Sequence, residues 1–136
     1  TGPYSRYHLK QYIANNRNDL YEDRQLRLMI ESPEKEVVGI IDLFNFEPFH
    51  NRAEVGIVIA APYRQKGVGQ LALQLLMEHC FDFIGIHQLY AHIDVTNEAS
   101  IRLFKKCGFG QCGYLKEWMR TGKNYRDVVI VQCLNS

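Results

Sequence analysis

The sequence predicts an α+β fold in which mostly antiparallel strands form a mixed sheet around one central strand-helix-strand-helix unit. Several short segments are rich in β-branched residues or alternate apolar with polar residues, which is typical of strands. One segment, residues 68–83, instead repeats apolar residues at helical spacing and lies between two of those strands. A length of 136 residues fits a single domain, which we expect to span residues 1–136.

The N-terminal part of the chain is expected to form a helix and then three strands. Apolar and polar residues mix over residues 4–14 in a way that favours a short amphipathic helix. The second and third strands are separated by few enough residues for an antiparallel, hairpin-like pair. The three strands are expected over residues 26–30, 37–44 and 53–60.

The remaining segments predict two helices, a fourth strand and a hairpin. The first helix begins close to Gly69, and residues 89–95 alternate as a strand that buries one face. Thr96 or Asn97 caps a second, short helix, which ends before Gly108, where a left-handed residue is favoured. Two further strands, over residues 114–120 and 127–134, are joined by a glycine-containing turn and complete the chain as a hairpin.

Charge and composition exclude several classes of partner. Sixteen Lys and Arg against fifteen Asp and Glu give a net charge of +1, so no overall field attracts nucleic acid or an anionic membrane. The longest mainly apolar stretch, residues 68–86, contains too many polar residues to span a bilayer, and residues 1–20 lack the pattern of a signal peptide. We therefore expect a cytoplasmic protein with no membrane partner, and nucleic acid is a disfavoured partner.

The cysteines and histidines predict no metal site. The cysteines form no CxxC or Cys/His cluster with zinc spacing, and we expect them to be reduced thiols in the core. The five histidines form no HxH or HExxH pattern. His92 alternates with apolar strand residues, which is more typical of an ordinary sheet residue than of a base. The four cysteines are Cys80, Cys107, Cys112 and Cys133.

Residues 64–69, with the sequence RQKGVG, are the most informative segment of the chain. Glycines there allow backbone N–H groups to close around an anion at the positive end of a helix, and Arg64 and Lys66 add positive charge. The loop matches neither the Walker motif nor the dinucleotide fingerprint, which argues against nucleotide hydrolysis and hydride transfer. A phosphate cradle is the functional interpretation, although a plain glycine-containing turn explains the isolated loop as well.

A second motif follows at the distance of one helix and one strand. Asn97 precedes a helix that ends in a Gly-Phe pair at residues 108–109. In the first motif, Arg64, Gly67 and Gly69 match the pattern Gln/Arg-x-x-Gly-x-Gly/Ala. With these two motifs in order, the chain resembles the GNAT superfamily of acetyl-CoA-dependent N-acetyltransferases, most of all its branch of ribosomal-protein N-terminal and spermidine N-acetyltransferases.

This resemblance, which covers residues 26–134, implies the GNAT fold and the place of the co-substrate acetyl-CoA. In that fold the third and fourth strands splay, and the pantetheine arm pairs with the exposed backbone of the third strand. The N–H of Ile59 or Val58 then points at the thioester carbonyl as an oxyanion donor. Because only 25 residues precede Leu26, we expect the N-terminal strand or helix of the fold to be shortened or missing. The implied contacts with acetyl-CoA involve Ile57, Val58, Ile59, Arg64, Gln65, Lys66, Gly67, Val68, Gly69, Gln70, Asn97, Ser100, Phe104 and Lys106.

Acetyl transfer also needs a base for the ammonium group and an acid for the departing thiolate. Glu54 is the candidate base, and a simple ion pair with Arg52 or another basic residue is the equally weighted alternative. In many members of the family a Tyr in the second helix supplies the acid, and Phe104 stands in its place here. Ser100 could hydrogen-bond the sulfur or, equally, help to cap the helix. Cys107 has no activating base placed near it by the sequence.

The resemblance therefore implies an N-acetyltransferase that moves acetyl from acetyl-CoA to a primary amine by direct attack in a ternary complex. Phe104 motivates the alternative, an acyl-CoA-binding module with weakened or lost catalysis. A polyamine, another small amine or a protein N-terminus all fit as the acceptor, and a homo-oligomer is left open.

Lys106 or Arg102, in the basic segment 102–126, is placed for the 3′-phosphate of CoA, and a solvated basic face is the alternative. Acidic residues that could attract a polyamine, or could be ordinary surface charge, are Glu22, Asp23, Asp42 and Glu47.

Overall fold

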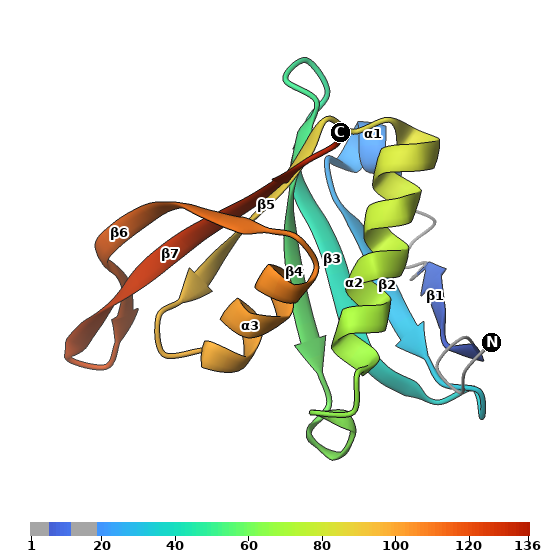
Figure 1. Cartoon of the computed structure of the whole chain (residues 1–136), viewed down its shortest axis with the longest axis horizontal. Coiled ribbons are helices and arrows are strands. Elements are labelled where there is room, and N and C mark those ends of the chain that lie inside the picture. The colour runs from blue at the N-terminus through green and yellow to red at the C-terminus, as the bar shows by residue number, and fades with distance from the viewer. Residues whose placement is uncertain (1–5, 12–18) are drawn as a thin grey trace.

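One seven-stranded sheet organises the chain in the computed structural model, which describes residues 6–11 and 19–136 (Figure 1). Its strand order is β1-β2-β3-β4-β5-β7-β6, and every neighbouring pair is antiparallel except β4 and β5. The elements are β1 (His8–Gln11), α1 (Leu20–Asp23), β2 (Leu26–Glu31), β3 (Val37–Glu47), β4 (Arg52–Ile59), η2 (Ala61–Tyr63), α2 (Val68–Glu78), the π-helical η3 (His79–Ile84), β5 (Gln88–Asp94), α3 (Glu98–Lys106), β6 (Gly110–Thr121) and β7 (Asn124–Leu134).

The expected strands, helices and C-terminal hairpin are confirmed, and the helix expected over residues 4–14 is wrong. Within that segment His8–Gln11 forms β1, an edge strand that pairs antiparallel with β2. The open edge of β2 offers this segment backbone hydrogen bonds, and Leu9 packs against the core from there. Tertiary pairing therefore overrides the local helical pattern. Residues 4–5 and 12–14 of the expected helix lie outside the described residues.

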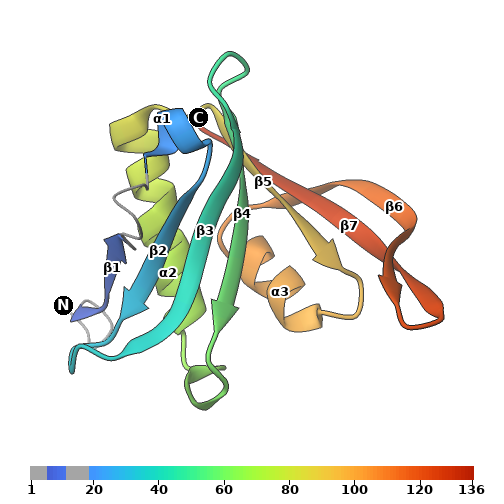
Figure 2. The ribbon, with the colours of Figure 1, turned by 180° about the vertical axis from the view of Figure 1, so that it is seen from behind.

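The core lies between the sheet and α2, which covers one face of β2, β3 and β4 (Figures 1 and 2). Alternate residues of the strands are buried, as the period of two requires: Leu28 on β2, and Ile41 and Leu43 on β3. From α2, Leu73 and Leu76 are fully buried on the same side. None of the helices in the described part of the chain has both the length and the apolar composition of a membrane span.

The strands β4 and β5 splay apart, as the resemblance to the GNAT superfamily implies. They pair in parallel over only three residues each, Arg52–Glu54 with Gln88–Tyr90. Beyond this point β4 continues to pair with β3, while β5 pairs along its whole length with β7. Helix α3 lies at the opening between the diverging strands (Figures 1 and 2). Among the described residues, no strand pairs with this edge of β4 from Val55 onward.

The hairpin of β6 and β7 extends away from the rest of the sheet (Figure 1). Its ladder shifts register between Leu115 and Met119, where three residues of β6 lie opposite the single residue Asp127 of β7. Asp127 stabilises this bulge by accepting hydrogen bonds from the Tyr114 hydroxyl and, at 2.8 Å, from the N–H of Glu117. These two bonds hold the pKa of Asp127 below its usual range, the Tyr114 hydroxyl having the larger effect.

We expect acid to loosen this hairpin. The lowered pKa of Asp127 means that its bonds add stability above the ordinary aspartate value of about 3.9, and that this stability is lost as the pH falls through the lower, folded value. Trp118, the only tryptophan in the chain, lies in the bulge and reports the change by fluorescence. An acid transition in the parent protein should be absent or flattened in Asp127→Asn, and an identical transition in both would contradict the assignment.

Candidate active site

The edge of β4 that faces the opening presents the backbone groups of alternate residues. Ala60 donates its N–H to the carbonyl of Val38 at the end of the β3–β4 ladder, at 2.9 Å. Successive residues of an antiparallel strand point their N–H and C=O groups to opposite sides. Val58 therefore directs its N–H toward β3, whereas Ile57 and Ile59 direct theirs toward the opening. Of the two oxyanion donors suggested by the sequence, Ile59 has the N–H that faces the opening.

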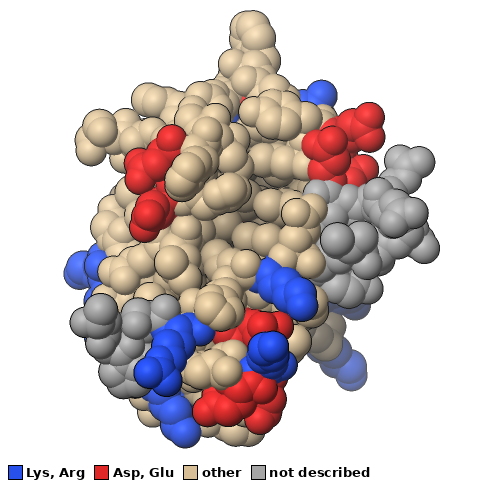
Figure 3. Space-filling model, turned by 90° about the vertical axis from the view of Figure 1, so that its right-hand side faces the viewer, with Lys and Arg blue, Asp and Glu red and all other residues tan. Residues whose placement is uncertain are grey.

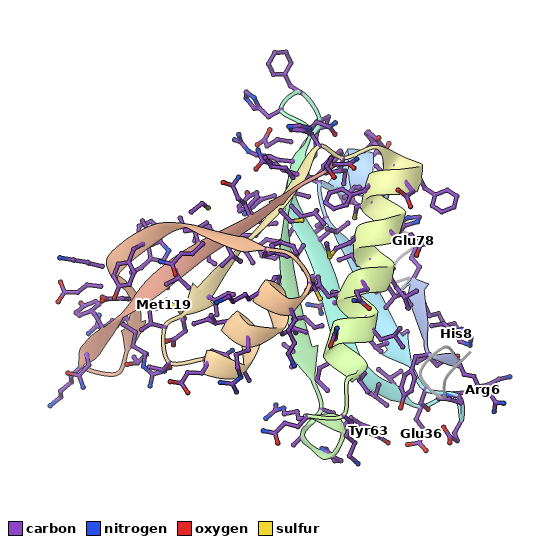
Figure 4. The ribbon with its side chains drawn as sticks, viewed as in Figure 1. Arg6, His8, Glu36, Tyr63, Glu78 and Met119 are labelled. Atoms are coloured by element: carbon purple, nitrogen blue, oxygen red, sulfur yellow. The ribbon has the colours of Figure 1, made fainter. Side chains whose placement is uncertain are left out.

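The loop after β4 is tied to this strand edge. The Nε of Arg64 donates to the carbonyl of Ile59 at 2.8 Å, so the guanidinium is held beside the last residue of the strand. Tyr63 precedes it in η2 and donates its hydroxyl to Glu36 at 3.1 Å; both residues are labelled near the bottom of Figure 4. That bond raises the pKa of the Tyr63 hydroxyl above its usual value. The tyrosine therefore anchors the loop to the segment between β2 and β3.

Gly67 lies at the N-terminus of α2 in a left-handed conformation, with φ of 80° and ψ of 0°. The first hydrogen bond of the helix runs from the N–H of Leu71 to the carbonyl of Gly67, at 3.1 Å. The preceding N–H groups of α2 therefore have no acceptor within the helix, and they carry the positive end of its dipole. Together with Arg64 this end of α2 concentrates positive charge, and a phosphate site there stays a prediction.

A cavity of about 660 Å³ lies between this loop, the edge of β4 and helix α3. Three cationic side chains line it, Arg64 from the loop and Arg102 and Lys106 from α3. Two residues that the resemblance places at acetyl-CoA do not line it: Lys66 is exposed, and Val68 is buried in the core beneath the helix. The other lining residues are Ile57, Val58, Ile59, Tyr63, Gln65, Gly67, Gly69, Gln70, Asn97, Ala99, Ser100 and Leu103.

A second cavity, of about 390 Å³, opens between the splayed strands themselves. Both cavities are lined by Ile57, Val58, Asn97 and Ser100, so they meet at the opening between β4 and β5. An elongated ligand in the first cavity can therefore meet a different ligand in the second. The residues that line only the second cavity are Arg27, Ile40, Asp42, Val55, Gly56, Ala91, His92, Ile93, Asp94 and Phe104.

Asn97, Ser100 and Phe104, all singled out in the sequence, lie at or in helix α3. Its N-cap is Asn97, whose carboxamide oxygen accepts from the N–H of Ser100 at 3.1 Å. The Asn97 side chain therefore provides the cap, and the half-buried Ser100 lies at the junction of the two cavities. Phe104 lines the second cavity and is only 2% exposed. Its ring meets that of Phe109 edge-on, with centroids 4.9 Å apart.

Glu54 pairs with a basic residue, as the alternative expectation has it, but the partner is His92 and not Arg52. Glu54 is 7% exposed, and both of its carboxylate oxygens have partners. One oxygen accepts from the Asn45 amide at 3.1 Å, and the other lies 2.6 Å from Nδ1 of His92. The sequence pattern predicts that His92 is an ordinary sheet residue and not a base. Its period-two position was visible in the sequence, but its contact with Glu54 depends on how β4 and β5 are placed side by side.

Two further carboxylates line the second cavity, and each has a cationic partner. Asp42 accepts two hydrogen bonds from Arg27, both at 2.9 Å. Asp94 accepts from the N–H and hydroxyl of Thr96 and, at 3.0 Å, from Arg126. The N–H of Thr96, followed by the hydrogen bond from Arg126, holds the pKa of Asp94 below its usual range. Each of these carboxylates thus has an arginine as a hydrogen-bond partner.

All four cysteines are free thiols, and two of them, Cys80 and Cys107, are buried as expected. Cys112 is exposed, so the expectation of core thiols is wrong for that residue. Burial raises the pKa of Cys80 to about 12 and also raises that of Cys107. Such thiols are poor nucleophiles. Within the described residues, no group of three or more His, Cys, Asp or Glu side chains could hold a metal ion.

Comparison with known proteins agrees with this geometry. A family model described as an acetyltransferase (GNAT) domain matches residues 1–110. The chain is 25% identical over 134 residues to spermidine N(1)-acetyltransferase of Vibrio cholerae, covering 98% of this chain and 76% of that protein. It is 29% identical over 116 residues to spermidine N(1)-acetyltransferase of Escherichia coli K12, covering 82% of this chain and 62% of that protein.

Solved structures show the same likeness. A chimera of the Vibrio cholerae spermidine N-acetyltransferase superposes with a TM-score of 0.81 at 26% identity, covering 85% of this chain and 70% of that chain. A structure described as dodecameric spermidine N-acetyltransferase from Vibrio cholerae gives a TM-score of 0.87 at 22% identity. That match covers 97% of this chain and 95% of the other, and it shows a shared fold.

Proposed function

The chain belongs to the GNAT family of acetyl-CoA-dependent N-acetyltransferases, and from this premise we propose that the two joined cavities bring acetyl-CoA and a polyamine acceptor together. Acetyl-CoA would occupy the larger cavity, and the acceptor amine the smaller one. The observation that carries the proposal is the shared wall of the cavities at the opening between β4 and β5. An amine entering there from the second cavity approaches a thioester held along the edge of β4.

The residues around the larger cavity fit acetyl-CoA in charge and in backbone geometry. The N-terminus of α2 and Arg64 would hold the pyrophosphate, and Arg102 or Lys106 the 3′-phosphate. The free N–H groups of Ile57 and Ile59 would pair with the amide-bearing pantetheine arm, as an added strand would. Acetyl-CoA supplies the reactive thioester. The N–H of Ile59 would donate to the negative charge that develops on the thioester oxygen.

Phe104 cannot donate a proton, so the CoA thiolate would leave as an anion or take a proton released elsewhere. This is tolerable because thiols have pKa values near 8.5, which makes thiolates good leaving groups. Ser100, at the junction of the cavities, would be the hydroxyl nearest to this chemistry from α3. The absence of the tyrosine that many relatives use therefore weakens proton supply without removing catalysis.

We expect Phe104→Tyr to keep the CoA affinity and to leave the rate of acetyl transfer equal or raised. The new hydroxyl would enter the second cavity, and it costs about 1–3 kcal/mol of stability only if it remains unpaired there. Phe109→Tyr is the matched control, because Phe109 is 3% exposed and does not line either cavity. Calorimetry with CoA and a thiol-release assay measure the two effects. A folded Phe104→Tyr protein that binds CoA but is much slower would show that the apolar ring itself is needed.

A polyamine is the acceptor that the relatives and the second cavity favour together. Two of the relatives reported above are spermidine N(1)-acetyltransferases. Asp42 and Asp94, which both line the second cavity, would attract the further cationic groups that distinguish a polyamine from a monoamine. Their arginine partners Arg27 and Arg126 reduce this attraction, so the affinity should be modest and salt-dependent.

The direct test is thiol release from acetyl-CoA with the unmodified protein and a panel of amines. The panel contains spermidine, a monoamine of similar length and a peptide with a free N-terminus. We expect spermidine to have the highest kcat/KM. Release with the peptide alone would replace the polyamine by a protein N-terminus as acceptor. Binding of CoA without release for any amine would support the alternative of an acyl-CoA-binding module.

Self-association and location complete the proposal. Among the described residues, the hairpin of β6 and β7 exposes Tyr114, Trp118, Met119 and Tyr125, each by 42% or more, and Met119 is labelled in Figure 4. Such a group of exposed apolar side chains favours a homo-oligomer, which light scattering would detect.

On the face shown in Figure 3 the visible charges lie in small groups of both signs, which does not favour a nucleic-acid partner. Four free thiols favour a reducing compartment, and we propose the cytoplasm.

A further inference from the structure

A chain of three side chains leads from the exposed Asn45 through the buried Glu54 to the second cavity. Asn45 on β3 donates to one oxygen of Glu54 on β4 at 3.1 Å, and the other oxygen lies 2.6 Å from Nδ1 of His92 on β5. The side chain of Glu54 is 9% exposed and does not line the cavity, whereas that of His92 is 31% exposed and does. A ligand in the cavity therefore meets the imidazole and not the carboxylate.

We infer that His92 is the base that takes the proton from the acceptor amine, and that Glu54 is its positioning residue. This inference rests on the proposed function and changes the role expected of Glu54. The carboxylate is already engaged on both oxygens, so to act as a base itself it would have to give up a partner. The arrangement follows the general pattern in which a buried acid orients an imidazole toward a reacting group.

The Glu54 contact decides which nitrogen of His92 is free. An ionised carboxylate only accepts hydrogen bonds, so the nitrogen beside it, Nδ1, carries the hydrogen. In the neutral imidazole the other nitrogen, Nε2, then has the lone pair. Asn45 in turn holds the second oxygen of Glu54, which restricts rotation of the carboxylate. The three residues thus select the tautomer that a proton acceptor needs.

The other titratable groups around the cavity are less suited to the task. Asp42 has both oxygens bonded to Arg27, and Asp94 has one on Thr96 and the other on Arg126. Tyr90 lies beside His92, with ring centroids 6.1 Å apart. Burial, followed by the charge of Glu54, raises the pKa of the Tyr90 hydroxyl, so it keeps its proton. Among the described residues lining this cavity, His92 is the side chain with a free basic nitrogen.

The proton balance of the reaction gives His92 one defined step. The ammonium form of the acceptor gives a proton to Nε2, and the imidazolium, stabilised by Glu54, later returns that proton to water. The neutral amine then attacks the thioester, so a C–N bond forms and the C–S bond breaks. The second proton leaves the new amide nitrogen and ends on the thiolate, which gives the CoA thiol. No oxidant, reductant or metal is needed.

The test compares His92→Ala and Glu54→Gln with His87→Ala, a control at an exposed histidine outside both cavities. Each variant is assayed for thiol release with the best amine of the panel and with a β-fluorinated analogue that is neutral at the assay pH. We expect His92→Ala to lose about 10²–10⁴-fold in kcat with the basic amine, and less than about tenfold with the neutral one. Added imidazole should restore part of the loss, and CoA binding should be unchanged.

Glu54→Gln should show the same pattern of kcat losses as His92→Ala, for a different reason. The glutamine amide can donate to Nδ1, which moves the hydrogen of His92 to Nε2 and removes the free lone pair. Equal losses with both amines, or no loss in His92→Ala, would overturn the role of His92 while leaving the proposed function intact. No release by the unmodified protein with any amine would defeat the proposed function itself, and the role of His92 with it.

Discussion

Gly67→Val is expected to weaken CoA binding by about 100-fold or more, which corresponds to about 2.7 kcal/mol. Gly67 has a φ of 80° at the start of α2, a conformation that a β-branched residue adopts only under strain. Its backbone lines the larger cavity, so the valine side chain also fills space beside the N–H groups that would bind the pyrophosphate. Backbone strain and obstruction of the N–H groups at the start of α2 therefore arise from the same substitution.

Gly85→Val separates these two effects. Gly85 has the same φ of 80°, but it lies beyond the other end of the helical segment, outside both cavities, and a Cβ added there meets nothing within 4 Å. Both variants should therefore lose stability through backbone strain, whereas only Gly67→Val should lose CoA affinity. Thermal denaturation and calorimetry with CoA provide the two readings. Unchanged affinity in Gly67→Val, or an equal loss in both variants, would contradict a phosphate site at residues 64–69.

Gly39→Ala is expected to destabilise the fold by about 1–3 kcal/mol, a large effect for one methyl group. Gly39 lies on β3 opposite Ile59, and a Cβ there would be 2.6 Å from the carbonyl oxygen of Val58. That oxygen belongs to the backbone, so the clash with the added Cβ can be relieved only if β4 moves away from β3. Such a movement shifts the strand edge that would hold the pantetheine arm. We therefore expect weaker CoA binding as well as a lower denaturation midpoint.

Gly110→Ala is the control for this substitution. Gly110 also lies in a strand, at the start of β6, and its added Cβ meets nothing within 4 Å. Both substitutions reduce the freedom of the unfolded chain equally, so Gly110→Ala should be neutral or slightly stabilising. Urea denaturation of the two variants measures the difference. If both variants have the same free energy of unfolding, the close approach of β3 and β4 does not explain why residue 39 is a glycine.

Local sequence accounts for the helices and strands and for the half of the candidate site formed by residues 64–69 and the start of α2. The strands alternate with a period of two, α2 and α3 repeat apolar residues at helical spacing, and residues 64–69 combine glycines with Arg64 before a helix. The Asn97 cap follows equally from neighbours three residues apart. These features depend on interactions within a few residues, which a sequence displays directly. The position of the loop and helix start that we propose as the phosphate site could therefore be predicted.

Tertiary structure decided the features that join distant segments. Residues 8–11 have a helical pattern, yet they form β1 because β2 offers an open edge. Glu54 and His92 lie 38 residues apart, and their contact exists because β4 and β5 pair in parallel for three residues and then diverge. The same divergence joins the two cavities. Periodicity shows which face a side chain occupies, but the sequence alone does not show which strand lies beside it, and the acceptor side of this site is built from that choice of neighbours.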